Sequence, residues 1–191
     1  MERLGLFGGS FNPVQCGHLL VARAALEELA LDRLVFIPAT ESPFKPGQTL
    51  APGAARLRLL RLALAGWTQV EVDDQEIARG GVSYTIDTVR VYADRFPGVK
   101  LFYLVGADHL STLPLWREAE DLAKLAEFVV IPRPGQACGP LPPPFHGRLL
   151  KGFPLGVSAS QIRARIKQGL PLEGLVPATV AEAILNSGLY L

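Results

Sequence analysis

Short apolar segments alternate with amphipathic segments along most of this chain. Short continuous apolar runs predict β-strands, whereas apolar residues that recur every three or four positions predict helices. Strands are predicted just before Gly8 and at 33–39, 70–72, 100–105, 128–131 and 148–153. Helices are predicted at 19–29, 54–65, 83–96, 115–125, 162–168 and 178–186. This alternation predicts a parallel α/β sheet with right-handed crossovers.

The strand expected at 100–105 (KLFYLV) is almost continuously apolar, which is typical of a parallel strand covered on both faces. The chain has 191 residues, 49% of them apolar, so we expect one domain over residues 1–191 that ends in two helices. In such sheets, ligands bind beyond the carboxyl ends of the strands. The segments that follow predicted strands should therefore converge on one cleft, namely Gly8–Gly9, the loop at 40–45, Asp108 and Arg133.

The turn between the first strand and the first helix carries the strongest chemical signal. Gly8 and Gly9 lack Cβ atoms, so backbone amides can approach a ligand closely. The helix that follows Gly17 offers free N–H groups and the positive end of its dipole, and His18 can add a side-chain donor. The loop fits neither the Walker pattern nor the dinucleotide-binding pattern of glycines. It indicates a phosphate site, although a tight turn with an incidental histidine would look similar.

A second anion site is predicted near the C-terminus. Ser158 and Gln161 form the Ser-x-x-Gln pattern of a capping box, which opens the helix at Ile162. Hydroxyls and amides at this helix start would face an anion, and Arg163 would add a guanidinium fork. An ordinary amphipathic helix with a good N-cap has the same residues. The Gly-His loop about 140 residues earlier favours the anion site.

Composition excludes several classes of protein. The net charge is +1 with scattered Lys and Arg, so we expect no dedicated nucleic-acid surface and no membrane surface. No apolar run is long enough for a membrane span, and the N-terminus lacks a signal-peptide pattern. Two cysteines are too few for a disulfide framework, and a reducing cytoplasm is the expected location. The Cys and His spacings argue against a zinc site, and we expect no metal held by protein side chains.

The first loop as a whole, Gly-Gly-x-Phe-x-Pro-x-x-x-Gly-His, resembles the signature loop of the nucleotidyltransferase superfamily. The form found here is most similar to the nicotinate-mononucleotide adenylyltransferase family. Further segments match this family at 76–88, 106–108, 116, 133–135, 157–163 and 174–190. The resemblance implies a Rossmann-like, doubly wound parallel α/β sheet in a single domain with C-terminal helices.

The resemblance also implies two sets of binding residues. ATP would be bound by Gly8, Gly9, Ser10, Phe11, Gln15, Gly17, His18, Gly106, Asp108, Ser158, Ile162 and Arg163. Nicotinate mononucleotide would be bound by Asn12, Lys45, Tyr84, Thr85, Trp116 and Arg133. His18, Arg163 and Lys45 would act in catalysis. Simpler roles remain open for Asp108 as a helix N-cap, for Trp116 as a core aromatic and for Arg133 as a solvated charge.

Two positions depart from the family pattern. The family loop usually reads His-x-Gly-His, whereas its first position here is Gln15. A glutamine amide can still donate a neutral hydrogen bond. The family's Pro-Pro-His-Lys is here Ser42-Pro43-Phe44-Lys45, and Phe44 cannot donate to a phosphate.

The resemblance implies adenylyl transfer from ATP to nicotinate mononucleotide, with Mg²⁺ bound to the ATP phosphates. Two alternatives are open. One is a related adenylyltransferase that acts on nicotinamide mononucleotide or pantetheine phosphate. The other is a nucleotide-binding protein without turnover, which the residues at positions 15 and 44 would suggest. The sequence leaves the oligomeric state open, and a homo-oligomer is allowed.

Overall fold

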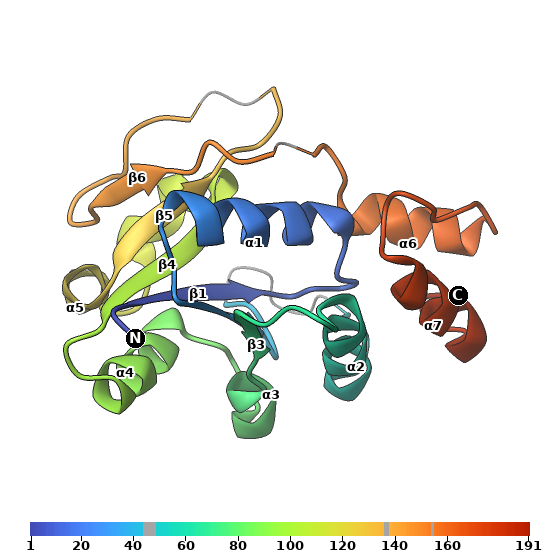
Figure 1. The fold of residues 1–191 in the computed structure, drawn as a ribbon, viewed down its shortest axis with the longest axis horizontal. Helices are drawn as coiled ribbons and strands as arrows, with labels where there is room; N and C mark the ends of the chain where they lie inside the picture. Colours follow the sequence, from blue (N-terminus) through green and yellow to red (C-terminus); the bar gives the residue numbers. More distant parts are fainter. Residues whose placement is uncertain (44–48, 136–137, 154) are drawn as a thin grey trace.

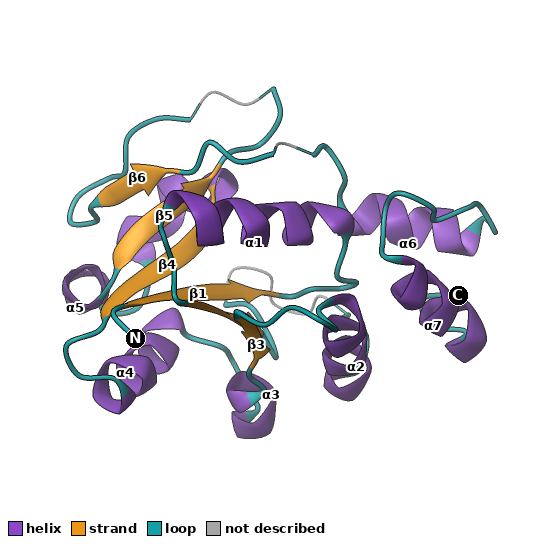
Figure 2. Ribbon diagram, in the orientation of Figure 1, coloured by secondary structure: helices purple, strands orange, loops and turns teal. Residues whose placement is uncertain are grey.

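The computed structural model describes residues 1–43, 49–135, 138–153 and 155–191, and it confirms the parallel α/β sheet (Figure 1). The strands are β1 (Arg3–Gly9), β2 (Arg33–Pro38), β3 (Val70–Val72), β4 (Lys100–Gly106), β5 (Glu127–Ile131) and β6 (Gly147–Leu149). The helices are α1 (Cys16–Glu28), α2 (Gly53–Ala63), α3 (Gln75–Arg79), α4 (Thr85–Arg95), the 3-10 helix η1 (Ala107–Leu115), α5 (Ala119–Leu125), α6 (Ala159–Lys167) and α7 (Ala178–Ser187). Helices cover both sides of the sheet (Figure 2), so the sheet is doubly wound, as expected.

The strand order determines where a ligand can bind. The six strands run β3-β2-β1-β4-β5-β6, and all neighbouring pairs are parallel. The chain first forms β1, β2 and β3 in order toward one edge of the sheet, and it then returns to the other side of β1 with β4. The boundary between β1 and β4 is the switch point of the sheet. Near this switch, Phe7 of β1 is paired with Leu104 of β4 on one side and with Phe36 of β2 on the other. The crossovers on either side of the switch leave in opposite directions, which opens a crevice at the carboxyl ends of β1 and β4.

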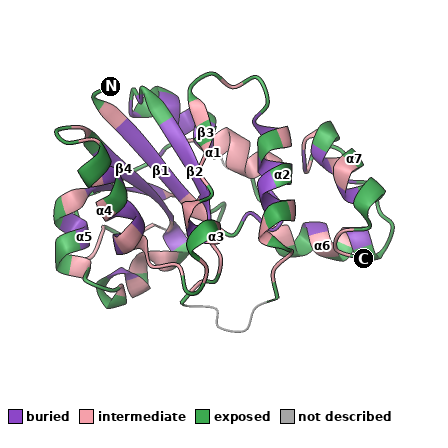
Figure 3. Ribbon diagram, turned by 90° about the horizontal axis from the view of Figure 1, so that it is seen from below, coloured by how far each residue is buried: buried purple, intermediate pink, exposed green. Residues whose placement is uncertain are grey.

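Alternate residues of the central strands belong to two different cores. Phe7 packs in the core that includes α1 and α2, whereas Leu4 and Leu6 pack in the core that includes α4 and α5. In β4, Leu104 packs in the first of these cores and Tyr103 packs in the second. Figure 3 shows β1, β2 and β4 buried along most of their length. Burial on both faces explains why the sequence of β4 is almost continuously apolar.

The two C-terminal helices extend the first of these cores. Ile162 and Ile166 of α6 and Val180 and Ile184 of α7 are all buried in it. Helix α7 ends at Gly188, which adopts the left-handed conformation (φ 63°) that glycine favours. Among the described helices, none has the length and apolar character needed to cross a lipid bilayer.

The strand predicted at 148–153 is wrong in its second half. β6 comprises only Gly147–Leu149. The backbone N–H groups of Lys151 and Gly152 instead donate to the carboxylate of Glu28, at 2.9 and 2.7 Å. The Leu150 N–H still donates to the Val130 carbonyl of β5 at 2.9 Å, and beyond it the Glu28 side chain at the end of α1 takes the next two donors. The sequence pattern carries no sign of that contact.

The helix predicted at 115–125 begins too early. Residues up to Leu115 belong to the 3-10 helix η1, which contains Pro114, and α5 starts only at Ala119. Glu118 between them has a left-handed backbone (φ 52°), which no continuous α-helix contains. The predicted helix therefore began four residues before the observed one.

Helix α3 is absent from the sequence-based assignment. It comprises only Gln75–Arg79, which is too short to produce a helical periodicity. The carboxylate of Asp73 holds its start by accepting hydrogen bonds from the Gln75 backbone N–H and side-chain amide, both at 2.9 Å. This helix places Glu76 beside the site described below.

Candidate active site

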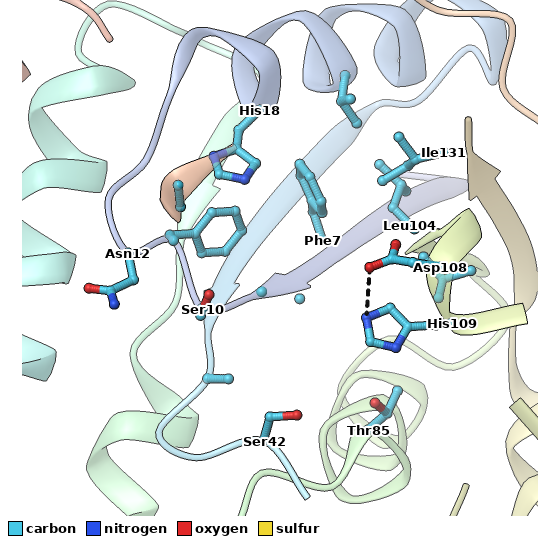
Figure 4. A pocket seen from close by; sticks show the side chains of 18 of the residues that line it. Phe7, Ser10, Asn12, His18, Ser42, Thr85, Leu104, Asp108, His109 and Ile131 are labelled. Carbon is cyan, nitrogen blue, oxygen red and sulfur yellow. Dashed lines mark ion pairs between the residues drawn. The ribbon is translucent and has the colours of Figure 1, made fainter. Parts of the chain in front are cut away.

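A cavity of about 740 Å³ opens at the carboxyl ends of β1 and β4. Figure 4 shows side chains from distant parts of the chain around it, including Ser10, His18, Thr85 and Asp108. Most of the residues expected at the site line this cavity, namely Gly8, Gly9, Ser10, Phe11, Asn12, Gln15, Gly17, His18, Tyr84, Thr85, Gly106, Asp108, Trp116, Arg133, Ser158 and Arg163. The fold therefore gathers the predicted segments in one place.

Of the expected site residues that the structure describes, Ile162 does not line the cavity. Lys45, together with Phe44, lies outside the described residues. Ile162 has no exposed surface and packs in the hydrophobic core of α1 and α2. Its apolar side chain anchors α6 in that core, and the expected contact of Ile162 with ATP stays a prediction.

Gly8 and Gly9 line the cavity, and packing gives Gly8 a second reason to be glycine. A Cβ atom on Gly8 would lie 2.4 Å from the hydroxyl oxygen of Tyr103, and one on Gly9 would lie 3.2 Å from the Phe11 ring. Neither glycine has a positive φ, because both belong to the end of β1. The missing side chains thus let Tyr103 reach under the loop from the neighbouring strand, in addition to exposing backbone to a ligand.

His18 is held as a neutral donor at the start of α1. Its Nδ1 atom accepts a hydrogen bond from the Gln15 backbone N–H at 3.1 Å, so the ring proton is on Nε2. The ring packs edge-on against Phe11 and Phe7, with centroids 5.0 and 6.1 Å away. Burial, helped by the positive charge of Arg133, lowers the pKa of His18 to about 4. At neutral pH His18 therefore offers one N–H and no net charge.

Gln15 is the N-cap residue of α1 and is 5% exposed. Its side-chain oxygen is buried and makes no hydrogen bond to a described residue. An amide oxygen only accepts hydrogen bonds, so a contact of Gln15 with a phosphate would come from its side-chain N–H groups. The position of Gln15 in the cavity wall agrees with the expectation that it faces the same ligand as His18.

The start of α6 reaches the same cavity from the other end of the chain. The capping box is confirmed, since the Ser158 hydroxyl accepts from the Gln161 backbone N–H and the Gln161 side chain accepts from the Ser158 N–H. Arg163 donates to the Asn12 carbonyl oxygen at 2.8 Å and to the Ser160 hydroxyl at 3.2 Å. The N-terminal ends of α1 and α6 are thereby joined beside the cavity.

Aromatic side chains form the opposite wall. Thr85 begins α4, and its hydroxyl lies 3.3 Å from that of Tyr103. The guanidinium of Arg117 stacks on the Tyr84 ring at 4.9 Å. Trp116 contacts Tyr103 at 6.2 Å between ring centroids and also lines the cavity, so it is both a packing residue and part of the wall. This wall can accept a flat ring.

Asp108 and Arg133 form an ion pair at the cavity edge, with 3.4 Å between Nη2 and Oδ1. Burial opposes ionisation of Asp108, but the charges of Arg133 and His109 outweigh it, and the pKa of Asp108 is lowered. Figure 4 shows the Asp108–His109 contact. Asp108 lies inside η1 and does not cap it, so the N-cap role is wrong. Arg133 is half exposed just after β5, so it is a solvated charge that also pairs with Asp108.

Comparison with known proteins places the chain in a family. A family model described as cytidylyltransferase-like matches residues 6–165. The chain belongs to this cytidylyltransferase-like family. A relative from Bordetella petrii, named a probable nicotinate-nucleotide adenylyltransferase, is 41% identical over 202 residues and covers 100% of both chains. One of the same name from Opitutus terrae is 36% identical over 197 residues, covering 98% of this chain and 97% of its own.

Solved structures have the same fold. The nicotinic acid mononucleotide adenylyltransferase of Plasmodium falciparum, complexed with NaAD, superposes with a TM-score of 0.81 at 14% sequence identity. It covers 100% of this chain and 98% of that one. The expected nucleotidyltransferase fold is thus confirmed. At 14% identity the likeness concerns the fold alone.

Sequence reasoning missed several residues of the cavity wall in this cytidylyltransferase-like protein. They are Phe7, Val21, Ala39, Leu50, Tyr103, Leu104, Val105, His109, Leu115, Arg117, Leu122, Ile131, Pro132, Leu150, Gly152, Phe153 and Leu155. His109 and Arg117 directly follow predicted site residues, so adjacency was an available signal. Tyr103 lies inside an apolar strand, and only the packing of β4 beside Gly8 reveals it.

Proposed function

We propose that this protein transfers the adenylyl group of ATP to nicotinate mononucleotide, giving nicotinate adenine dinucleotide and pyrophosphate. A phosphate oxygen of the mononucleotide attacks the α-phosphorus of ATP in line. One phosphorus–oxygen bond forms to the acceptor, and the bond between the α-phosphorus and the bridging oxygen breaks as pyrophosphate leaves. No protein nucleophile is needed, so catalysis consists of positioning and charge stabilisation.

One observation carries the proposal: two helix N-termini and an aromatic wall share one cavity. The starts of α1 and α6 are sites for anions, because free N–H groups and the helix dipole favour negative charge there. The hydrogen bond between Arg163 and the Asn12 carbonyl brings these two starts together. A polyphosphate would occupy this end, and a pyridine ring would occupy the wall at Tyr84, Thr85 and Trp116.

The two principal donors would act differently. His18 would donate its Nε2–H to a phosphate oxygen that gains charge in the transition state, and its neutral form makes this donation independent of pH near 7. Arg163 would clamp the triphosphate with a guanidinium whose plane is fixed by Asn12 and Ser160. Lys45, which the family resemblance adds, would serve as a further cation.

Enzymes that transfer adenylyl groups generally use a divalent metal ion with ATP, and we propose Mg²⁺ here. The carboxylates that line the cavity suit an ion carried mainly by the nucleotide. Glu76 accepts a hydrogen bond from Thr88, Asp108 pairs with Arg133, and no three metal-binding side chains gather among the described residues. Mg²⁺ keeps several waters and takes few protein ligands at phosphate sites. The ion would neutralise charge on the phosphates, with Asp108 positioned to order its water shell.

Pyrophosphate release tests the proposal. Purified protein is assayed with ATP and Mg²⁺ against nicotinate mononucleotide, nicotinamide mononucleotide and pantetheine phosphate. The N–H groups at the start of α4, beside Thr85, would favour an acidic ring substituent over a neutral amide. We expect kcat/KM for the nicotinate form to be at least about tenfold higher, which requires only about 1.4 kcal/mol.

The outcomes separate the alternatives. Equal or reversed values for the two pyridine nucleotides would reject the proposed selectivity and leave adenylyl transfer standing. Preference for pantetheine phosphate would assign a different member of the superfamily. ATP binding without turnover of any acceptor would identify a nucleotide-binding protein that lacks catalysis, consistent with Gln15 at a position where the family usually has histidine.

A further inference from the structure

Arg56 in α2 is a buried cation that does not line the cavity. Its exposed fraction is 2%, and its guanidinium donates three hydrogen bonds to backbone carbonyl oxygens. Nη1 donates to Ser10 at 2.8 Å and to Ala39 at 2.7 Å, and Nε donates to Ala51 at 2.9 Å. All three acceptors belong to loops rather than to regular elements, so one side chain ties three loops to the start of α2.

The loops held by Arg56 form the wall of the candidate active site. Ser10 belongs to the glycine-rich loop and Ala39 follows β2, and both line the cavity. They are also joined to each other, because the Ala39 N–H donates to the Gly9 carbonyl at 2.9 Å. Arg56 therefore contacts this part of the cavity wall from behind, on the side away from a bound ligand.

Two residues after Ser10, the side chain and backbone of Asn12 hold the same loop by further hydrogen bonds. The Asn12 side-chain oxygen accepts from the Ala51 N–H at 3.1 Å, and its carbonyl oxygen accepts from Arg163 at 2.8 Å. A continuous chain of hydrogen bonds thus runs from α6 through Asn12 and Ala51 to Arg56. The loop backbone at Ser10 and Asn12 is therefore held by Arg56 on one side and by Arg163 on the other.

The charge of Arg56 has no carboxylate partner. Among the described residues, no ion pair involves Arg56, and the ionisable group that faces it is the buried hydroxyl of Tyr190. A buried cation without a counter-charge is costly, and burial lowers the pKa of Arg56. A neutral side chain would pack here at lower cost, so simple filling of the space between α2 and the sheet does not account for an arginine.

We propose that Arg56 is a positioning residue for adenylyl transfer: it fixes the backbone of the glycine-rich loop and the end of β2 in the geometry that receives the phosphates, and it adds positive charge behind them. This inference rests on the proposed function. Arg56 touches no substrate in this arrangement. It acts through Ser10 and Ala39, and a displacement of that backbone by about 1 Å is enough to lower a rate by about 100-fold.

Two substitutions at position 56 and one control test the proposal. Arg56→Met removes the charge and all three donors while keeping an unbranched chain. Arg56→Lys keeps the charge but loses the planar fork. Arg58→Met is the control, because Arg58 is exposed on the same helix and the substitution also removes one positive charge. For each protein we would measure the thermal unfolding midpoint, the ATP dissociation constant by calorimetry without acceptor, and kcat and KM well below the unfolding midpoint.

We expect Arg56→Met to lower kcat by about 10- to 100-fold and to weaken ATP binding by about tenfold. The kcat of Arg56→Lys should be at least about threefold higher than that of Arg56→Met, since an ammonium can still reach one or two of the carbonyl groups. Arg58→Met should stay within about twofold of wild type. A folded Arg56→Met protein with wild-type kcat and ATP affinity would overturn the proposal, as would an equal loss in Arg58→Met.

Two further results keep the test decisive. If Arg56→Met does not fold, Arg56→Lys decides alone, and wild-type kcat in that protein would reduce Arg56 to a purely structural residue. If wild-type protein turns over no acceptor, the proposed function fails, and the calorimetric ATP affinity of the Arg56 variants still reports whether the loop is positioned by this side chain.

Discussion

The protonation state of His18 gives the sharpest prediction, and His18→Gln is the substitution that isolates it. His18 is the third residue of α1, and its Nδ1 accepts the N-cap backbone N–H of Gln15. Glutamine is a common residue at this position of a capping box and can accept the same hydrogen bond through its side-chain oxygen. The variant therefore keeps the helix cap and removes only the titratable group.

The magnitude follows from the two pKa values. Burial lowers the pKa of His18 from 6.5 to about 4, so between these values the unfolded chain binds a proton that the folded chain does not. Unfolding free energy must therefore rise with pH across this window and fall as the pH drops. For a single group with these pKa values, wild type loses about 2 kcal/mol between pH 7 and pH 5 through His18 alone.

Urea unfolding of both proteins at pH 7 and pH 5 measures this difference. All other titrating groups are common to the two proteins, so subtraction isolates the contribution of residue 18. We expect wild type to lose about 2 kcal/mol more than His18→Gln between the two pH values. Parallel pH dependences would refute the reasoning, because they would mean that His18 titrates normally in the folded protein and is not held as a neutral donor.

Three further predictions concern other residues of the site. Gly8→Ala should destabilise the fold by roughly 1–3 kcal/mol in urea unfolding, because its Cβ would meet the Tyr103 hydroxyl. Adding Tyr103→Phe should relieve part of that loss, whereas additive losses in the double variant would argue against this clash. Arg163→Lys should weaken ATP binding at least about tenfold although the charge is kept, because an ammonium cannot bond Asn12, Ser160 and a phosphate in one plane; wild-type affinity by calorimetry would assign Arg163 to structure alone. Gln15→Ala should lower kcat by about 10- to 100-fold and Gln15→His should remain active; unchanged turnover in the alanine variant would show that the Gln15 side chain does not face the phosphates.

The sequence predicted the parts of this protein that depend on short-range patterns. Alternation of apolar strands and amphipathic helices was enough for the parallel α/β sheet, because each element shows its own periodicity. The doubly wound arrangement was implied by the family resemblance. The capping box at Ser158 was predicted correctly, since the residues that form it are three positions apart. The convergence of the glycine-rich loop with Asp108 and Arg133 followed from the rule that parallel strands end at the same edge.

The sequence missed a boundary set by a distant partner and a helix too short to show a periodicity. β6 ends where Glu28, more than a hundred positions earlier in the chain, accepts the next two backbone donors. Helix α3 is held by Asp73 over too few residues for a periodicity to appear. The first contact depends on the end of α1 lying beside the segment after β6, which no local pattern encodes.

In the site too, some features follow from the sequence alone and others only from the tertiary structure. The sequence by itself determined which residue types are available: a histidine at a helix start, an arginine after a capped serine, and the aromatic residues Tyr84 and Trp116. Only the tertiary structure decided what state they adopt. His18 is neutral because Phe7, Phe11 and the Gln15 N–H surround it, and a pKa depends on surroundings that no local pattern encodes. Arg56 reads in the sequence as one more arginine on an amphipathic helix, and it becomes a buried clamp only because packing brings three loop carbonyls to its guanidinium.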